Sequence, residues 1–239
     1  YIYDNYLSIP DTTNLKEIDY GILQEQIDLL LSIFQETCHL NIMIWIYNKL
    51  DKYLNKDSKV ITINRDDLFV FWIETFKNAT FYGRYDLVKW LFNKSQHNIF
   101  GHLGCNDKDN ALSKQCLHTD DCCSFRNACC QGHLETAELL YDLGFMTGWH
   151  INLHTNNEWC FYWGCQSGNL EMVKWLYHKS KSIAKPFQNI VDIYHLLKED
   201  EPSLTDNKKS VLEWLSELQE LEGIATDWTL VDDDDFKLM

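Results

Sequence analysis

The sequence GNLEMVKWLYHKS at residues 168–180 matches GRYDLVKWLFNKS at residues 83–95, and a third copy, GHLETAELLYDLG, lies between them at residues 132–144. Each copy opens with a glycine, has an acid as its fourth residue, and then spaces its apolar residues three or four apart. That spacing places apolar side chains such as those of Leu170, Val173, Trp175 and Leu176 on one face of an α-helix. The repeat therefore predicts helices with a buried face, in which Trp90 and Trp175 are core residues.

A second, preceding helix is predicted to end at each of these glycines. A phenylalanine lies seven residues ahead of each glycine, and small residues lie three and four residues ahead of it. The phenylalanines are Phe76, Phe125 and Phe161. Small residues allow close helix packing, and glycine readily takes the left-handed conformation that ends a helix. The unit of the repeat is therefore a pair of helices joined by a glycine turn.

Polar segments separate the helix pairs. LHTDD at residues 117–121 and LHTNN at residues 153–157 lie 36 residues apart and are rich in turn-forming residues, so they predict the connecting fingers. Clear repeats span 66–95, 117–144 and 153–180; degenerate repeats span 15–55 and 187–220, and 221–239 is an acidic tail. The predicted fold is one all-α solenoid of about five helix pairs, with degenerate terminal caps and long inter-repeat loops.

The helix pair with Gly-(His/Asn)-Leu-Glu at its inner turn resembles the ankyrin repeat. The segment HTNNE ahead of an aromatic-rich helix resembles the divergent ankyrin repeats of giant (nucleocytoplasmic large) DNA viruses. The Thr-Pro-Leu-His opening of ankyrin repeats is absent, since WCFY occupies residues 159–162. The resemblance implies a non-catalytic scaffold or adaptor that binds host or viral proteins, in the host cytoplasm or in the virion. A structural virion component is the alternative within this class.

The resemblance also implies where a partner would bind. The two residues before each turn glycine would face the concave groove, and the finger residues would lie beside it. The implied contact residues are Phe81, Tyr82, Cys130, Gln131, Gln166, Ser167, Thr119, Asp120, Thr155, Asn156 and Glu158.

Charge and composition narrow the class of partner. The net charge of −15 repels phosphate backbones and anionic lipids, and the apolar runs are shorter than the roughly 20 residues of a membrane span. Nucleic acid and membranes are therefore not expected partners. Nine cysteines without a regular framework favour a reducing compartment and free thiols.

A zinc-stabilised, cysteine-rich binding module is a third hypothesis. Its candidate ligands are Cys105, Cys116, Cys122 and Cys123, although their spacing departs from the usual paired spacers. No nucleophile motif or glycine-rich phosphate loop is present, so we expect neither an enzyme nor a cofactor. The acidic tail is either a docking peptide for a basic partner or a solvated end.

Overall fold

The computed structural model describes residues 39–54, 65–97, 112–199 and 204–222. Within these ranges the regular elements are α-helices, and they include no strand. The predicted all-α class is therefore confirmed. The chain divides into two compact units, Tyr1–Asn152 and Leu153–Met239. No helix in the described part of the chain is long and apolar enough to cross a membrane.

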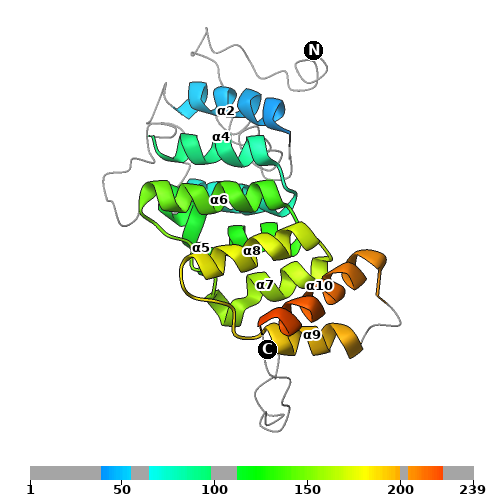
Figure 1. Ribbon diagram of the computed structural model, residues 1–239. Coiled ribbons are helices and arrows are strands. Elements are labelled where there is room, and N and C mark those ends of the chain that lie inside the picture. Colours follow the sequence, from blue (N-terminus) through cyan, green and yellow to red (C-terminus); the bar gives the residue numbers. More distant parts are fainter. Residues whose placement is uncertain (1–38, 55–64, 98–111, 200–203, 223–239) are drawn as a thin grey trace, which may run out of the picture. The chain divides into compact units, whose positions relative to one another are not determined.

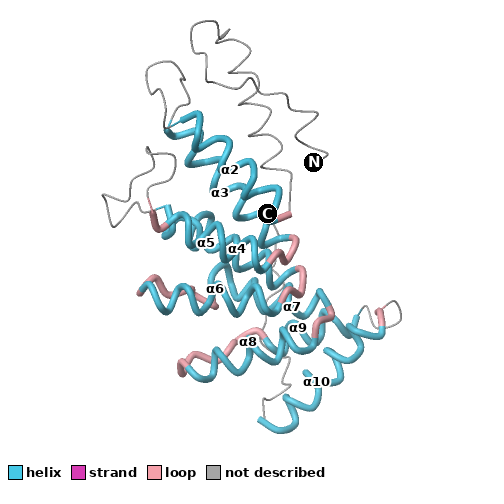
Figure 2. Tube along the Cα trace, turned by 90° about the horizontal axis from the view of Figure 1, so that it is seen from above, coloured by secondary structure: helices cyan, strands magenta, loops and turns pink. Residues whose placement is uncertain are grey.

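Unit 1 contains two layers of helices. Its elements are α2 (Leu40–Leu54), α3 (Arg65–Phe81), α4 (Tyr85–Ser95), α5 (Leu112–Cys130) and α6 (Leu134–Thr147). In Figure 1, α2, α4 and α6 lie in successive rows, with α3 and α5 in a layer behind them. Figure 2 shows the same helices from above. Contacts between α3 and α5 and between α4 and α6 hold neighbouring pairs together.

Unit 2 contains two further helix pairs. Its elements are α7 (Thr155–Ser167), α8 (Leu170–Ser182), α9 (Ile190–Glu199) and α10 (Asp206–Glu222). The α7 helix packs on α8, and α9 packs on α10, which also contacts both helices of the first pair. The degenerate repeat predicted for residues 187–220 therefore contains a helix pair. Residues 223–239 of the acidic tail and most of the residue 15–55 repeat lie outside the described residues.

The predicted glycine turns are confirmed. Gly83, Gly132 and Gly168 all have positive φ, at 62°, 72° and 72°. In the first turn, the amide of Gly83 donates to the carbonyl of Thr80, and the next amide donates to Ala79. The second turn repeats this pattern, which satisfies carbonyls that the helix end would otherwise leave without a donor. A Cβ on Gly83 would lie 2.5 Å from the ring of His133, so this turn requires glycine for space as well as for conformation.

The three predicted phenylalanines are all buried, as are Val173 and Leu176. The prediction that Trp90 and Trp175 are core residues is wrong, because both are half-buried. The two residues after each tryptophan are buried, and successive side chains along an α-helix are rotated by about 100° from one another. The tryptophans therefore lie at the margin of the core. Trp90 stacks there on Trp72, with ring centroids 6.2 Å apart.

Candidate functional site

The end of α3 carries the most exposed of the predicted contact pairs. Phe81 is 39% exposed and Tyr82 is 54% exposed, and their rings meet edge to face with centroids 5.3 Å apart. The glycine turn fixes the backbone beside them. His133 lies just before α6, and its Nε2 atom is 3.0 Å from the carbonyl oxygen of Phe81. Two aromatic rings are thus exposed to solvent on a backbone segment that hydrogen bonds fix in place.

The corresponding pairs at the ends of α5 and α7 are polar. Gln131 is exposed beside the half-buried Cys130. Gln166 and Ser167 are half-buried, and the Gln166 side chain accepts a hydrogen bond of 3.2 Å from Lys208. The predicted contact positions therefore differ in chemistry from repeat to repeat, and the aromatic pair lies in unit 1.

The predicted fingers share an unusual backbone. Residues 120–122 have φ of 51°, 54° and 60°, and residues 156–158 have φ of 51°, 53° and 63°. Each finger is thus a short left-handed turn made without glycine, which costs conformational energy at every residue. Asp120 and Asn156 are exposed at the two tips, whereas Thr119 and Thr155 are half-buried. The Thr119 hydroxyl donates to the carbonyl of Gln115.

Glu158 differs from the other predicted contact residues because it is only 6% exposed. Its carboxylate accepts hydrogen bonds from the backbone amides of Gln188, at 2.9 and 3.0 Å, and Asn189, at 3.1 Å. Its Oε1 atom also lies 3.2 Å from Nδ1 of His154. The carboxylate anchors the segment that leads into α9. Glu158 therefore holds the fold together and does not present a surface to a partner, contrary to our prediction.

The cysteines near the first finger have the character of buried thiols. Burial raises the pKa of Cys116 well above its usual range and also raises that of Cys122, so both are neutral thiols at pH 7. Zinc binds thiolates, and this environment disfavours them. Cys123 is half-buried, and its Sγ lies 3.8 Å from Oδ1 of Asn127. Among the described residues no three potential ligands converge, and Cys105 lies outside them.

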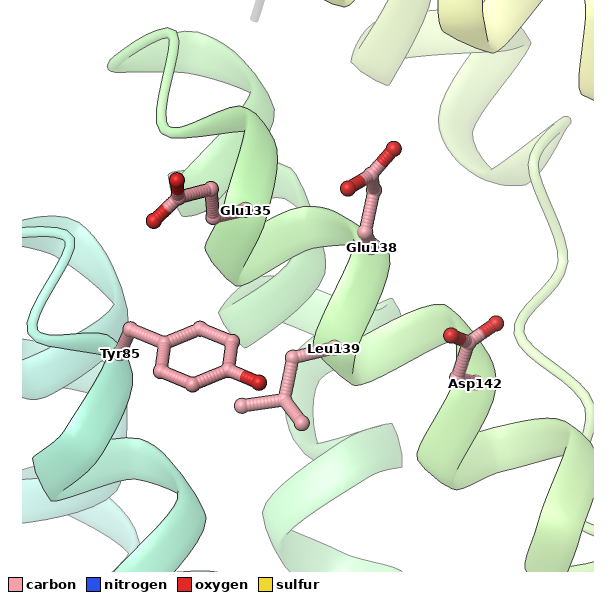
Figure 3. Close-up of a pocket in the computed structure, with 5 residues that line it drawn as sticks. All are labelled: Tyr85, Glu135, Glu138, Leu139 and Asp142. Carbon is pink, nitrogen blue, oxygen red and sulfur yellow. The ribbon is translucent and has the colours of Figure 1, made fainter.

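A hollow of about 400 Å³ lies on the second-helix layer of unit 1. Figure 3 shows the Tyr85 ring of α4 pointing toward Leu139 of α6, with the carboxylates of Glu135, Glu138 and Asp142 around them. The hollow is acidic and open.

Besides Phe145, Met146 and Ile183, sequence reasoning missed two groups of exposed apolar side chains. Val70 is exposed on α3. On α7, the partly exposed rings of Trp159 and Tyr162 both contact Trp163, at centroid distances of 6.3 and 5.3 Å. The spacing of three and four residues on α7 would have identified this second group as one helical face.

Comparison with known proteins gives no assignment. No family model matches the chain, and neither a curated protein nor a solved structure matches it. The site must therefore be interpreted from its own geometry.

Proposed function

We propose that this chain is an ankyrin-like repeat protein that binds another protein without catalysing a reaction. Three glycine-turned helix pairs support this proposal, since helical repeats of this kind stack into extended binding surfaces. The proposed solenoid has about five helix pairs. Its resemblance to viral ankyrin repeats favours an adaptor for host or viral proteins, acting in the host cytoplasm or in the virion.

The exposed pair Phe81 and Tyr82 carries the proposal. Aromatic residues dominate the energetics of protein interfaces, because a large apolar ring gains much from leaving water. Here the backbone that carries the rings is held by a glycine turn and by the contact of His133 with the Phe81 carbonyl, and the two rings contact each other. A pre-ordered backbone loses little conformational entropy on binding, so the pair is suited to anchor a partner.

Quantitative affinity capture tests the proposal. The full chain is immobilised and incubated with lysate from host cells, and captured proteins are compared by mass spectrometry with those captured by the double variant Phe81→Ala and Tyr82→Ala. The matched control is Phe145→Ala and Met146→Ala, which removes two exposed apolar side chains at the end of α6.

We expect the first variant to lose a specific partner by about tenfold or more, as truncation of an interface anchor does. The control should retain that partner. Equal recovery by both variants would disprove binding through this surface. Recovery of capsid or core proteins from infected cells would instead favour the virion component.

Chelation separates the scaffold from a zinc module. A buried neutral thiol such as Cys116 or Cys122 is a poor zinc ligand, so EDTA should leave the melting temperature and helical circular dichroism unchanged. A large loss of helicity that zinc restores would show that the cysteine cluster binds metal.

A further inference from the structure

The outward face of α3 combines apolar and charged side chains in a fixed order. Val70, Glu74, Lys77 and Phe81 follow one another at intervals of four, three and four residues, so they lie on one face of the helix. The two apolar residues, at either end of this set, are exposed, and the charged residues lie between them. We call these four residues, together with Tyr82 and the neighbouring Asp120, the α3 face.

Two carboxylates, those of Glu74 and Asp120, accompany one ammonium group, that of Lys77, and the neighbouring Arg126 donates a hydrogen bond of 2.7 Å to the backbone carbonyl of Asp120. The Nζ atom of Lys77 lies 2.9 Å from Oε1 of Glu74 and 2.9 Å from Oδ2 of Asp120. Burial lowers the pKa of Lys77, but the hydrogen bonds and charges of the two carboxylates outweigh this effect and raise it to about 12. One permanent positive charge is therefore shared by two carboxylates, of which Asp120 has a 62% exposed side chain.

This arrangement specifies a partner. We propose that the α3 face binds a cationic protein segment that also carries an apolar or aromatic side chain, an inference that rests on the proposed scaffold function. The apolar side chain would pack against Phe81 and Tyr82, and the cations would approach the carboxylates of Glu74 and Asp120. Arginine suits both parts, because its guanidinium pairs with carboxylates and stacks on aromatic rings.

The net charge of the whole chain also favours a cationic partner. A net charge of −15 attracts a basic segment over a distance and speeds its association, and it repels polyanions and a second copy of the chain. The long-range field alone would hold a basic segment anywhere on the protein. The aromatic pair beside the shared carboxylates gives this face its local specificity.

The test uses two short labelled peptides of identical length and spacing. One contains arginine, lysine and leucine with a single tryptophan, and the other has glutamate in place of every basic residue. Binding to the full chain is measured by fluorescence anisotropy at low and physiological salt. The charge variant is Glu74→Gln with Asp120→Asn, and its matched control is Glu135→Gln with Glu138→Gln on the second-helix layer. Circular dichroism confirms that each variant is folded.

We expect the basic peptide to bind and the acidic peptide not to bind. The α3-face charge variant should weaken binding about fivefold and reduce its salt dependence, whereas the control should change it by less than about twofold. Phe81→Ala with Tyr82→Ala should weaken binding about tenfold. Equal effects of the two charge variants would overturn the proposal, because they would show a general field effect only.

Other outcomes separate this inference from the proposed function. If the aromatic double variant loses a captured partner and the charge variant binds basic peptide normally, the scaffold function stands and the cationic specificity is wrong. If neither variant affects capture of a partner, both the scaffold function and the cationic specificity are wrong. A dimer found by sedimentation and lost in the aromatic double variant would assign the face to a second copy of the chain and overturn the proposal.

Discussion

The two fingers have nearly the same backbone and different chemistry. In unit 1, Nδ1 of His118 lies 3.4 Å from Sγ of Cys122. In unit 2, Nδ1 of His154 lies 3.2 Å from Oε1 of Glu158, which is 36 residues further along. Cys122 and Glu158 each also accept a hydrogen bond from a backbone amide, that of Asn152 and that of Gln188 respectively. The left-handed turn thus depends on an acceptor at this position, and either a thiol or a carboxylate can provide it.

The difference between these acceptors predicts unequal stabilities. A carboxylate that accepts several amide hydrogen bonds holds its segment more strongly than a neutral thiol that accepts one. The segment before α9 therefore depends on the Glu158 carboxylate as well as on the packing of Phe187, whereas the corresponding segment after α6 depends more on its apolar packing alone, including the buried Ile151. Substitutions at equivalent positions of the two fingers test this contrast.

The largest expected effect is at Glu158. Glu158→Ala leaves the amides of Gln188 and Asn189 without their acceptor, and should lower the free energy of unfolding by about 4 kcal/mol. Cys122→Ala should cost only about 1 kcal/mol, since the lost hydrogen bond is weak. Urea denaturation followed by circular dichroism measures both. Similar losses from the two variants would show that the acceptors contribute equally.

The next effect concerns Phe187, which occupies the position of Ile151 in the other segment. Its ring stacks on Phe161, with centroids 4.4 Å apart, and also contacts the ring of His154. Phe187→Ile should therefore cost about 2 kcal/mol, because a smaller side chain leaves space above Phe161. The same denaturation experiment tests this, and an unchanged midpoint would mean that the two segments pack interchangeably.

A smaller and reciprocal pair of effects is expected where each segment begins. Gly148 and Ala184 both have positive φ, at 76° and 56°. Ala184→Gly should raise stability by about 1 kcal/mol by removing the strain of a left-handed alanine. Gly148→Ala should lower it by about the same amount, since no atom lies within 4 Å of the added Cβ. Thermal melting of the two variants should show shifts of opposite sign.

The smallest effect is a pH dependence of unit 1. Burial lowers the pKa of His118, more than its hydrogen bond to the Trp149 carbonyl raises it. The unfolded chain therefore binds this proton more readily than the folded chain, and stability falls as pH drops below about 6.5. His118→Gln should make the decrease in melting temperature between about pH 7 and pH 5 smaller. The variant His150→Gln, which removes an exposed imidazole elsewhere in unit 1, serves as the reference.

The sequence was most informative where the chain follows simple periodicities. The glycine turns, the first-turn acids such as Glu171 and the buried phenylalanines could all be predicted, because each is a local consequence of helix geometry. The fingers could be located, and their Asp-Asp and Asn-Asn pairs are residue types that tolerate positive φ, but Cys122 and Glu158 give no local signal that the left-handed backbone extends to a third residue. The role of Glu158 depends on amides 30 residues away, and no local pattern reveals that contact.

The candidate site was predicted less completely than the fold. The exposed position of Phe81 and Tyr82 agrees with the predicted place of a contact pair, but binding itself stays a prediction. The ion pair between Lys77 and Asp120 joins residues 43 positions apart and became visible only in three dimensions. The exposed Val70 had no equivalent in the other repeats to draw attention to it.

The close approach of Gly83 to His133 has a consequence for how this sequence can change over time. The imidazole fills the volume that any side chain at position 83 would need, so position 83 cannot take a side chain while His133 stays the same. In related chains, a larger residue at position 83 should therefore occur only with a smaller residue at position 133. The spacing between the first two glycine-turned helix pairs of unit 1 therefore depends on residues 83 and 133 together.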